Sequence, residues 1–219
     1  STTKSSLDQE FSLHVNDPKL WSPDSPFLYR TEVKLISNGE VQDEVKSYFA
    51  MRKISSKRDE NGIIRMQLNN EDIFQYGPLD QGWWPDGLYT APTDEALKYD
   101  IVRTKELGFN MIRKHVKVEP ARWYTHCDEL GILVWQDMPN GGRGPGWQSR
   151  SFFKGSEDQR SERSENIYKK EWKGIMDHLY SYPSIVVWVP FNEAWGQFNT
   201  VEITEWTKNY DPSRLVNSA

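Results

Sequence analysis

The chain has 219 residues and a formal net charge of -5, from 27 basic and 32 acidic side chains. This acidic balance gives no electrostatic footprint for nucleic acid or for an anionic membrane. No run of about 18 apolar residues occurs, so the sequence predicts no membrane span. The single cysteine, Cys127, excludes an internal disulfide, and four scattered histidines without paired spacing predict no metal site. The first residues carry no signal-peptide pattern, which leaves the compartment open.

Residues 11–49 alternate between apolar and polar side chains, which is the pattern of half-buried antiparallel strands. Asn38-Gly39 lies between two such runs and supplies the positive φ that a tight hairpin turn needs. About three strands fit, whereas an immunoglobulin-like sandwich has roughly seven, so we expect the chain to begin inside such a domain. The polar residues 55–61 are expected to form a linker or a turn, with Arg52 at a domain junction.

After residue 62 the sequence alternates between short apolar runs and amphipathic helical patterns. Residues 63–68 and 73–76 lead into a first strand, and further strands are expected at about 110–115, 132–138, 185–189 and 214–218. Helices are expected at about 94–107, 120–130, 168–182 and 200–209, the first capped by Thr93 and with Leu97, Ile101, Thr104 and Leu107 on one face. This order predicts a parallel α/β sheet.

The run from Ser184 to Val189 is apolar without alternation, as in a strand buried on both faces of a parallel sheet. Polar residues appear only at its end, in Asn192-Glu193. In parallel α/β barrels the carboxyl ends of the strands carry the active site. An Asn-Glu pair at this position therefore indicates chemistry rather than packing.

The segment 188–197, WVPFNEAWGQ, resembles the acid/base segment of glycoside hydrolase family 2, which includes β-galactosidases, β-glucuronidases and β-mannosidases. Three more segments match in order: LWSPDSPFLY at 20–29, GFNMIR at 108–113, and WYTHCDELG at 123–131 running into LVWQD at 133–137. The resemblance covers nearly the whole chain. It implies the C-terminal part of an immunoglobulin-like β-sandwich in residues 1–55 and about five strands of an eight-stranded TIM barrel in residues 56–219.

The activity that this resemblance implies is retaining hydrolysis of terminal β-linked sugars such as β-galactosides, without an organic cofactor. Retaining enzymes use two carboxylates roughly 5–5.5 Å apart. Glu193 is the expected acid/base, and a partly apolar surrounding from Phe191 and Trp195 would keep it protonated. Asn192 is expected to donate to the sugar 2-hydroxyl, and Arg113 to steady the nucleophile.

Five further side chains at predicted strand ends or near Glu193 are candidates for sugar binding: Asp80, Trp84, His115, Asp137 and Trp195. His115 follows Arg113 after one residue, which departs from the β-galactosidase pattern, so a place on the barrel rim is an equal alternative. Residues 140–163 are rich in glycine, serine and charge. We expect them to form a mobile loop over the barrel mouth.

No second motif-borne glutamate follows Glu193, so the nucleophile is expected outside this chain. The chain alone is then expected to be inactive and to self-associate through open barrel edges. Two alternatives stay open. One is a non-catalytic carbohydrate-binding protein on the same barrel, and the other is a β-mannosidase-like specificity, towards which Trp135-Gln-Asp137 leans.

Overall fold

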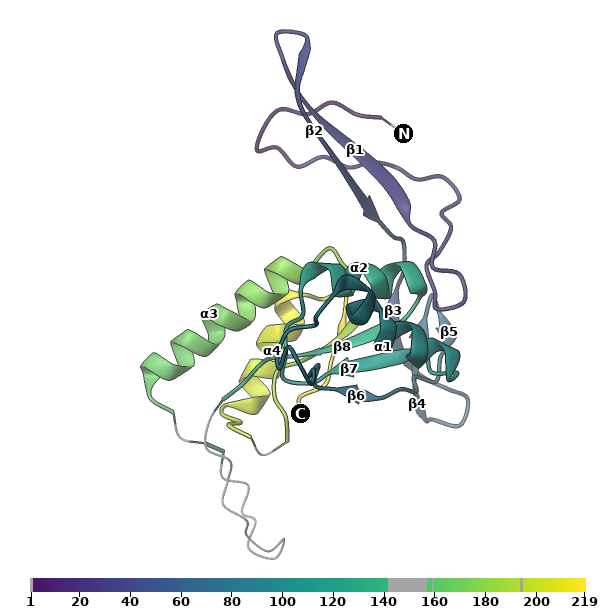
Figure 1. Cartoon of the computed structure of the whole chain (residues 1–219). Helices are drawn as coiled ribbons and strands as arrows, with labels where there is room; N and C mark the ends of the chain where they lie inside the picture. The colour runs from purple at the N-terminus through teal and green to yellow at the C-terminus, as the bar shows by residue number, and fades with distance from the viewer. Residues whose placement is uncertain (1, 142–156, 159, 194) are drawn as a thin grey trace, which may run out of the picture.

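The computed structural model describes residues 2–141, 157–158, 160–193 and 195–219. These residues form three sheets: a two-stranded hairpin, a three-stranded antiparallel sheet and a five-stranded parallel sheet with four helices. The hairpin projects away from the parallel sheet and its helices (Figure 1). Among the described residues, no helix is both long enough and apolar enough to cross a membrane.

The hairpin consists of β1 (Tyr29–Ser37) and β2 (Glu40–Phe49), which pair antiparallel. Its turn confirms the prediction from Asn38-Gly39, because both residues have positive φ, 52° and 84°. The expected strand near residue 11 is wrong, since residues 9–15 form no strand. Half-burial is confirmed only at one end of the hairpin, where Tyr29, Thr31 and Phe49 are partly buried. It is wrong for the rest, because the other apolar side chains of the hairpin are exposed, with no second sheet of the described chain packed on them.

The three-stranded sheet contains β3 (Ile54–Arg58), β4 (Ile64–Leu68) and β5 (Glu71–Asp72). Residues 55–58, expected in a linker or turn, therefore belong to a strand. Their polar side chains stay largely exposed while the backbone pairs with β4, which an edge strand permits. β3 also runs across the boundary placed at residue 55, so the division into two domains stays a prediction.

The parallel sheet has the order β10-β9-β8-β7-β6, which confirms five strands of a TIM-barrel sheet. Its strands are β6 (Leu79–Asp80), β7 (Met111–Lys114), β8 (Leu133–Asp137), β9 (Ile185–Val189) and β10 (Leu215–Val216). The helices are α1 (Asp94–Glu106), α2 (Ala121–Leu130), α3 (Glu162–Leu179) and α4 (Thr200–Tyr210). Their buried residues form one core with the sheet face that they cover (Figure 1).

Local signals set the helix ends. The Thr93 hydroxyl accepts a hydrogen bond from the amide of Ala96 at 3.1 Å, which confirms the predicted cap. Gly131 ends α2 in the left-handed conformation with φ 73°. Leu107 is exposed, which contradicts its expected place on the buried face, because α1 has already ended at Glu106.

The strand β9 is buried along its whole length, as its unbroken apolar sequence predicts. Trp188 faces the helices, with its ring centroid 5.6 Å from that of Trp172. Val187 and Val189 lie on the other face of the sheet, in a second cluster of buried apolar residues. Trp21, Ile54 and Leu68 join this cluster, so segments before the barrel cover part of its interior face.

Arg52 lies at the junction between the hairpin and the barrel, as expected. Its guanidinium donates to the carbonyl oxygens of Pro183 at 3.0 Å, Ile185 at 2.8 Å and Ser213 at 3.0 Å. Burial is the main cause that lowers the pKa of Arg52, to about 10. Because Ile185 is the first residue of β9, the junction fixes the amino end of the strand whose other end carries Glu193.

Asp128, at the end of α2, is a second junction residue and is fully buried. Its carboxylate accepts hydrogen bonds from the Tyr48 hydroxyl at 2.7 Å and from the Ser184 amide at 2.8 Å. Its backbone carbonyl accepts from Nε1 of Trp21 at 2.8 Å. Burial raises the pKa of Asp128 to about 7, although the hydrogen bonds from Ser184 and Tyr48 oppose the shift.

Candidate active site

The carboxyl ends of three neighbouring strands bring four predicted site residues into one hydrogen-bonded network. Arg113 lies in β7 and His115 directly follows this strand, Asp137 ends β8, and Asn192 follows β9. Parallel strands end at the same edge of their sheet, so residues far apart in sequence meet there. We call the set of Arg113, His115, Asp137 and Asn192 the strand-end network.

Arg113 and Asp137 form a two-pronged ion pair. Nε of Arg113 lies 3.0 Å from Oδ1 of Asp137, and Nη2 lies 3.1 Å from Oδ2. This geometry matches the planar fork of guanidinium to a carboxylate. The Asp137 side chain is only 1% exposed, and burial raises the pKa of Asp137 although Arg113 opposes that shift. Asp137 therefore orients Arg113 and has no face open to a sugar.

The amide of Asn192 has a fixed orientation. Its Oδ1 accepts from Nη2 of Arg113 at 3.3 Å and lies 3.0 Å from Nε2 of His115. The reverse orientation would place the amide NH₂ against a guanidinium, which has no acceptor. The Asn192 NH₂ group has no partner among the described residues and is available to donate to a ligand.

Both ring nitrogens of His115 have amide partners. Because Oδ1 of Asn192 can only accept, Nε2 of His115 donates to it, and Nδ1 lies 3.1 Å from Nε2 of Gln81. Gln81 was not among the predicted site residues, although its position one residue after β6 was a usable signal. His115 thus holds Asn192 in place through the same oxygen that Arg113 binds.

Glu193 is exposed and forms no hydrogen bond with the described residues. It lies in a turn closed by the bond from the Trp195 amide to the Asn192 carbonyl, 3.1 Å long. Trp195 is 63% exposed, whereas Phe191 is fully buried, with its ring 5.3 Å from that of Tyr168. The expected apolar surrounding of Glu193 is therefore not formed, because Phe191 packs into the helix core instead.

Asp80 lies outside the strand-end network. Its carboxylate pairs with Nζ of Lys114 at 2.6 Å and accepts from the amide of Gly82 at 2.7 Å. Since Lys114 alternates with Arg113 along β7, it faces the helices. Lys114 is 1% exposed and also pairs with Glu119 at 2.9 Å. The contacts of Asp80 are thus structural.

Trp84 also has no contact with the strand-end network. Its backbone amide donates to the Leu88 carbonyl at 2.7 Å inside the loop after β6. The neighbouring Trp83 is the exposed indole of this loop, and its ring lies 5.1 Å from that of Tyr89. Of the predicted aromatic residues, only Trp195 is both exposed and next to Glu193 in the turn.

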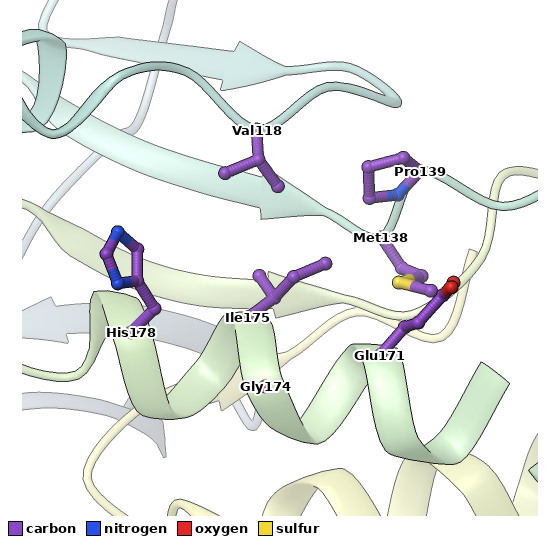
Figure 2. Close-up of a pocket in the computed structure, with 7 residues that line it drawn as sticks. All are labelled: Val118, Met138, Pro139, Glu171, Gly174, Ile175 and His178. Atoms are coloured by element: carbon purple, nitrogen blue, oxygen red, sulfur yellow. The ribbon is translucent and has the colours of Figure 1, made fainter. Parts of the chain in front are cut away.

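The described residues contain no group of three or more His, Cys, Asp or Glu side chains that could hold a metal ion. A pocket of about 370 Å³ lies between α3 and the end of β8 (Figure 2). It is lined by Val118, Met138, Pro139, Glu171, Gly174, Ile175 and His178. None of these residues belongs to the strand-end network, so this pocket is not the candidate site.

Asp137→Asn is expected to lower the free energy of unfolding by about 1–3 kcal/mol, because an NH₂ group would face the Arg113 fork and leave its charge unpaired. Urea denaturation of the 219-residue chain at pH 7 measures the change. Asp24→Asn is the matched control, since Asp24 is exposed and forms no hydrogen bond or ion pair through its side chain with the described residues. Equal midpoints for both variants would contradict the structural importance of the ion pair.

Two family models match the chain. The model for glycosyl hydrolases family 2 matches residues 1–52, and the model for the TIM barrel domain of the same family matches residues 90–219. The second match covers more than half of the chain. Both matches lie in the order that the sequence motifs predict.

Curated relatives align over almost the whole chain. A putative beta-glucuronidase of Formosa agariphila is 29% identical over 215 residues, which are 97% of this chain and 19% of the relative. A beta-galactosidase of Halalkalibacterium halodurans is 30% identical and covers 98% of this chain and 21% of the relative. The chain thus spans about a fifth of the length of these relatives.

Solved structures share the fold. An FMN-binding beta-glucuronidase from Facaelibacterium prausnitzii L2-6 superposes with a TM-score of 0.75 at 26% identity, over 92% of this chain and 30% of the other. The apo structure of Bacteroides uniformis beta-glucuronidase 3 gives a TM-score of 0.66 at 24% identity, over 91% of this chain and 24% of the other. The half-barrel and the preceding strands are therefore an arrangement found in larger proteins.

Proposed function

Because the chain belongs to glycosyl hydrolase family 2, we propose that the whole protein hydrolyses terminal β-linked glycosides with retention and that Glu193 is its acid/base. The observation that carries this proposal is the Asn192-Glu193 pair at the end of β9. Asn192 is held by Arg113 and His115, its NH₂ group has no partner among the described residues, and Glu193 beside it is exposed. A fixed donor next to an accessible carboxyl group is what a sugar hydroxyl and a leaving oxygen require.

In the first step Glu193 donates its proton to the leaving glycosidic oxygen while a second carboxylate attacks the anomeric carbon. The Asn192 NH₂ group donates to the 2-hydroxyl, a contact that strengthens in the transition state. In the second step Glu193 acts as base and takes a proton from the water that hydrolyses the glycosyl-enzyme intermediate. The same carboxyl group thus serves both steps.

The second carboxylate is proposed to lie outside the 219 residues. Asp137 is the carboxylate of the strand-end network, but it is buried and already bound through both oxygens. Nη1 of Arg113 has no partner among the described residues, so it is available to bind and orient an incoming carboxylate. A charge-assisted bond of this kind would keep the nucleophile ionised.

The identity of the sugar is the finer part of the proposal. The two curated relatives carry the names beta-glucuronidase and beta-galactosidase, which favours a β-galactoside or a β-glucuronide. The β-mannoside alternative rests on Trp135-Gln-Asp137. In this segment Trp135 donates to Oε1 of Gln75 at 2.6 Å, and Asp137 binds Arg113.

A screen of the whole protein against nitrophenyl β-galactoside, β-glucuronide and β-mannoside tests the function, with the matching α-glycosides as controls. Release of nitrophenol from one β-glycoside and from none of the α-glycosides supports it. Binding of a sugar without hydrolysis would favour a carbohydrate-binding protein. Hydrolysis of α-linked sugars alone would overturn the assignment.

The 219-residue chain by itself is expected to be inactive and to self-associate. An acid/base without a nucleophile cannot form the covalent intermediate. Within the described residues, the strands β6 and β10 are the unpaired edges of the parallel sheet, and the hairpin exposes an apolar face. Light scattering at increasing concentration should give a rising apparent mass. A constant monomer mass would show that the open edges are protected.

A further inference from the structure

We infer that Arg160 is a positioning residue that holds the turn carrying Glu193, an inference that rests on the proposed role of Glu193 as acid/base. Arg160 lies in the segment between β8 and α3, far in sequence from Glu193. Its side chain is 7% exposed, and its hydrogen bonds join Gly196, three residues after Glu193, to Asn140 and Gly141. No sequence motif singled it out.

One nitrogen of Arg160 makes the central contacts. Nη2 lies 2.8 Å from the Gly196 carbonyl, 2.7 Å from Oδ1 of Asn140 and 2.7 Å from the Gly141 carbonyl. Two hydrogens are thus shared among three acceptors. Bonds from a charged donor are stronger than neutral ones, so Arg160 links the Gly196 carbonyl firmly to Asn140 and Gly141, which follow β8.

Asn140 also binds the backbone that follows Glu193. Its Nδ2 donates to the carbonyl of Trp195 at 3.1 Å and to that of Gly196 at 3.2 Å. Its Oδ1 accepts from Arg160, which fixes the orientation of the amide. We call Asn140 and Arg160, with the carbonyls of Trp195 and Gly196, the turn clasp.

Buried aromatic rings support the turn clasp. The guanidinium carbon of Arg160 lies 4.7 Å from the ring centroid of Phe198 and 5.7 Å from that of Tyr168. Next to Arg160, the amide of Asp158 donates to the Gln197 carbonyl at 2.6 Å. The clasp therefore rests on the rigid core between α3 and α4, and it leaves Arg160 little freedom to move.

The clasp matters because Glu193 has no hydrogen bond of its own to the described residues. Before Glu193, the buried Phe191 anchors the chain in the core. After Glu193, the carbonyls held by Asn140 and Arg160 are the next fixed points. The position of the carboxyl group is thus set by the backbone on either side, and removing the clasp frees one of the two sides.

The test uses leaving-group dependence in the whole protein. Arg160→Ala is expected to lower kcat/KM by about 10- to 100-fold for an alkyl β-glycoside, because a displaced acid cannot reach the leaving oxygen. A dinitrophenyl β-glycoside needs little proton assistance, so its loss should stay under about threefold. Asn140→Ala should show the same pattern as Arg160→Ala, with a larger loss of kcat/KM on the alkyl glycoside than on the dinitrophenyl glycoside. Arg160→Lys, which keeps the charge without the fork, should retain part of the activity.

Arg163→Ala is the matched control, because Arg163 is exposed in the first turn of α3 and its side chain forms no hydrogen bond or ion pair with the described residues. A second measurement needs no activity: in the 219-residue chain, amide hydrogen exchange of the peptide around Trp195 should accelerate in Arg160→Ala and not in Arg163→Ala. Equal losses on both glycosides, or unchanged exchange at Trp195, would overturn the inference. If Glu193→Ala shows a leaving-group effect and Arg160→Ala does not, only the inference fails; if neither does, the proposed function fails with it.

Discussion

Glu193→Ala is expected to lower kcat/KM of the whole protein on unactivated β-glycosides by about 10²- to 10⁴-fold. The reason is that an alkoxide leaves only when its oxygen is protonated, and Glu193 is the exposed carboxyl group next to the fixed amide of Asn192. A dinitrophenyl glycoside should lose less in the first step, because its leaving group departs as a stable anion. The measurement is a set of initial rates over leaving groups of increasing basicity.

Azide provides an independent readout of the same role. A small anion can enter the space vacated by the Glu193 side chain and attack the glycosyl-enzyme intermediate without base assistance, so a β-azide product should accumulate. Glu205→Ala is the control, since Glu205 is an exposed carboxylate of α4 that forms no hydrogen bond or ion pair with the described part of the chain. Undiminished hydrolysis of an alkyl glycoside by Glu193→Ala would remove Glu193 from the mechanism.

The buried carboxyl group of Asp128 is expected to make folding stability depend on pH. Its pKa is about 7 in the folded chain, against an ordinary value of 3.8. Between these values the folded chain binds more protons than the unfolded chain, so the contribution is present in full below about pH 4 and is lost as pH rises to about 7. At about 1.4 kcal/mol per pH unit the loss approaches about 4 kcal/mol.

Asp128→Asn isolates this contribution, because the amide is neutral at every pH and keeps the shape of the protonated acid. Its Oδ1 can still accept from the Ser184 amide, and its NH₂ group can donate to the Tyr48 hydroxyl. Urea denaturation between pH 4 and pH 8 should show the variant gaining stability relative to the parent as pH rises. A constant difference over this range would contradict the shifted pKa.

Most of the barrel could be predicted from the sequence because each signal there is local. The unbroken apolar run of β9 needs burial on both faces, Thr93 supplies its own cap, and Gly131 takes a conformation that other residues avoid. The hairpin turn at Asn38-Gly39 is set in the same way. Burial of the hairpin failed, because alternation predicts a face but does not supply the sheet that covers it.

The sequence alone determined which residues stand at strand ends: Arg113, His115, Asp137, Asn192 and Glu193. Only the tertiary structure decided what they do there, because a side chain's role depends on its partners across the sheet. Asp137 turned out to be buried against Arg113, while Asp80 faces Lys114 on the helix side.

Arg160 contacts Gly196, 36 residues away, and Asp128 contacts Ser184 and Trp21, 56 and 107 residues away. No local sequence pattern exists for such contacts. Motif and periodicity follow from neighbours along the chain, and they fix the elements and the strand ends. Hydrogen-bond partners and burial follow from neighbours in space, and these arise only when the parallel strands align their carboxyl ends at one edge of the sheet.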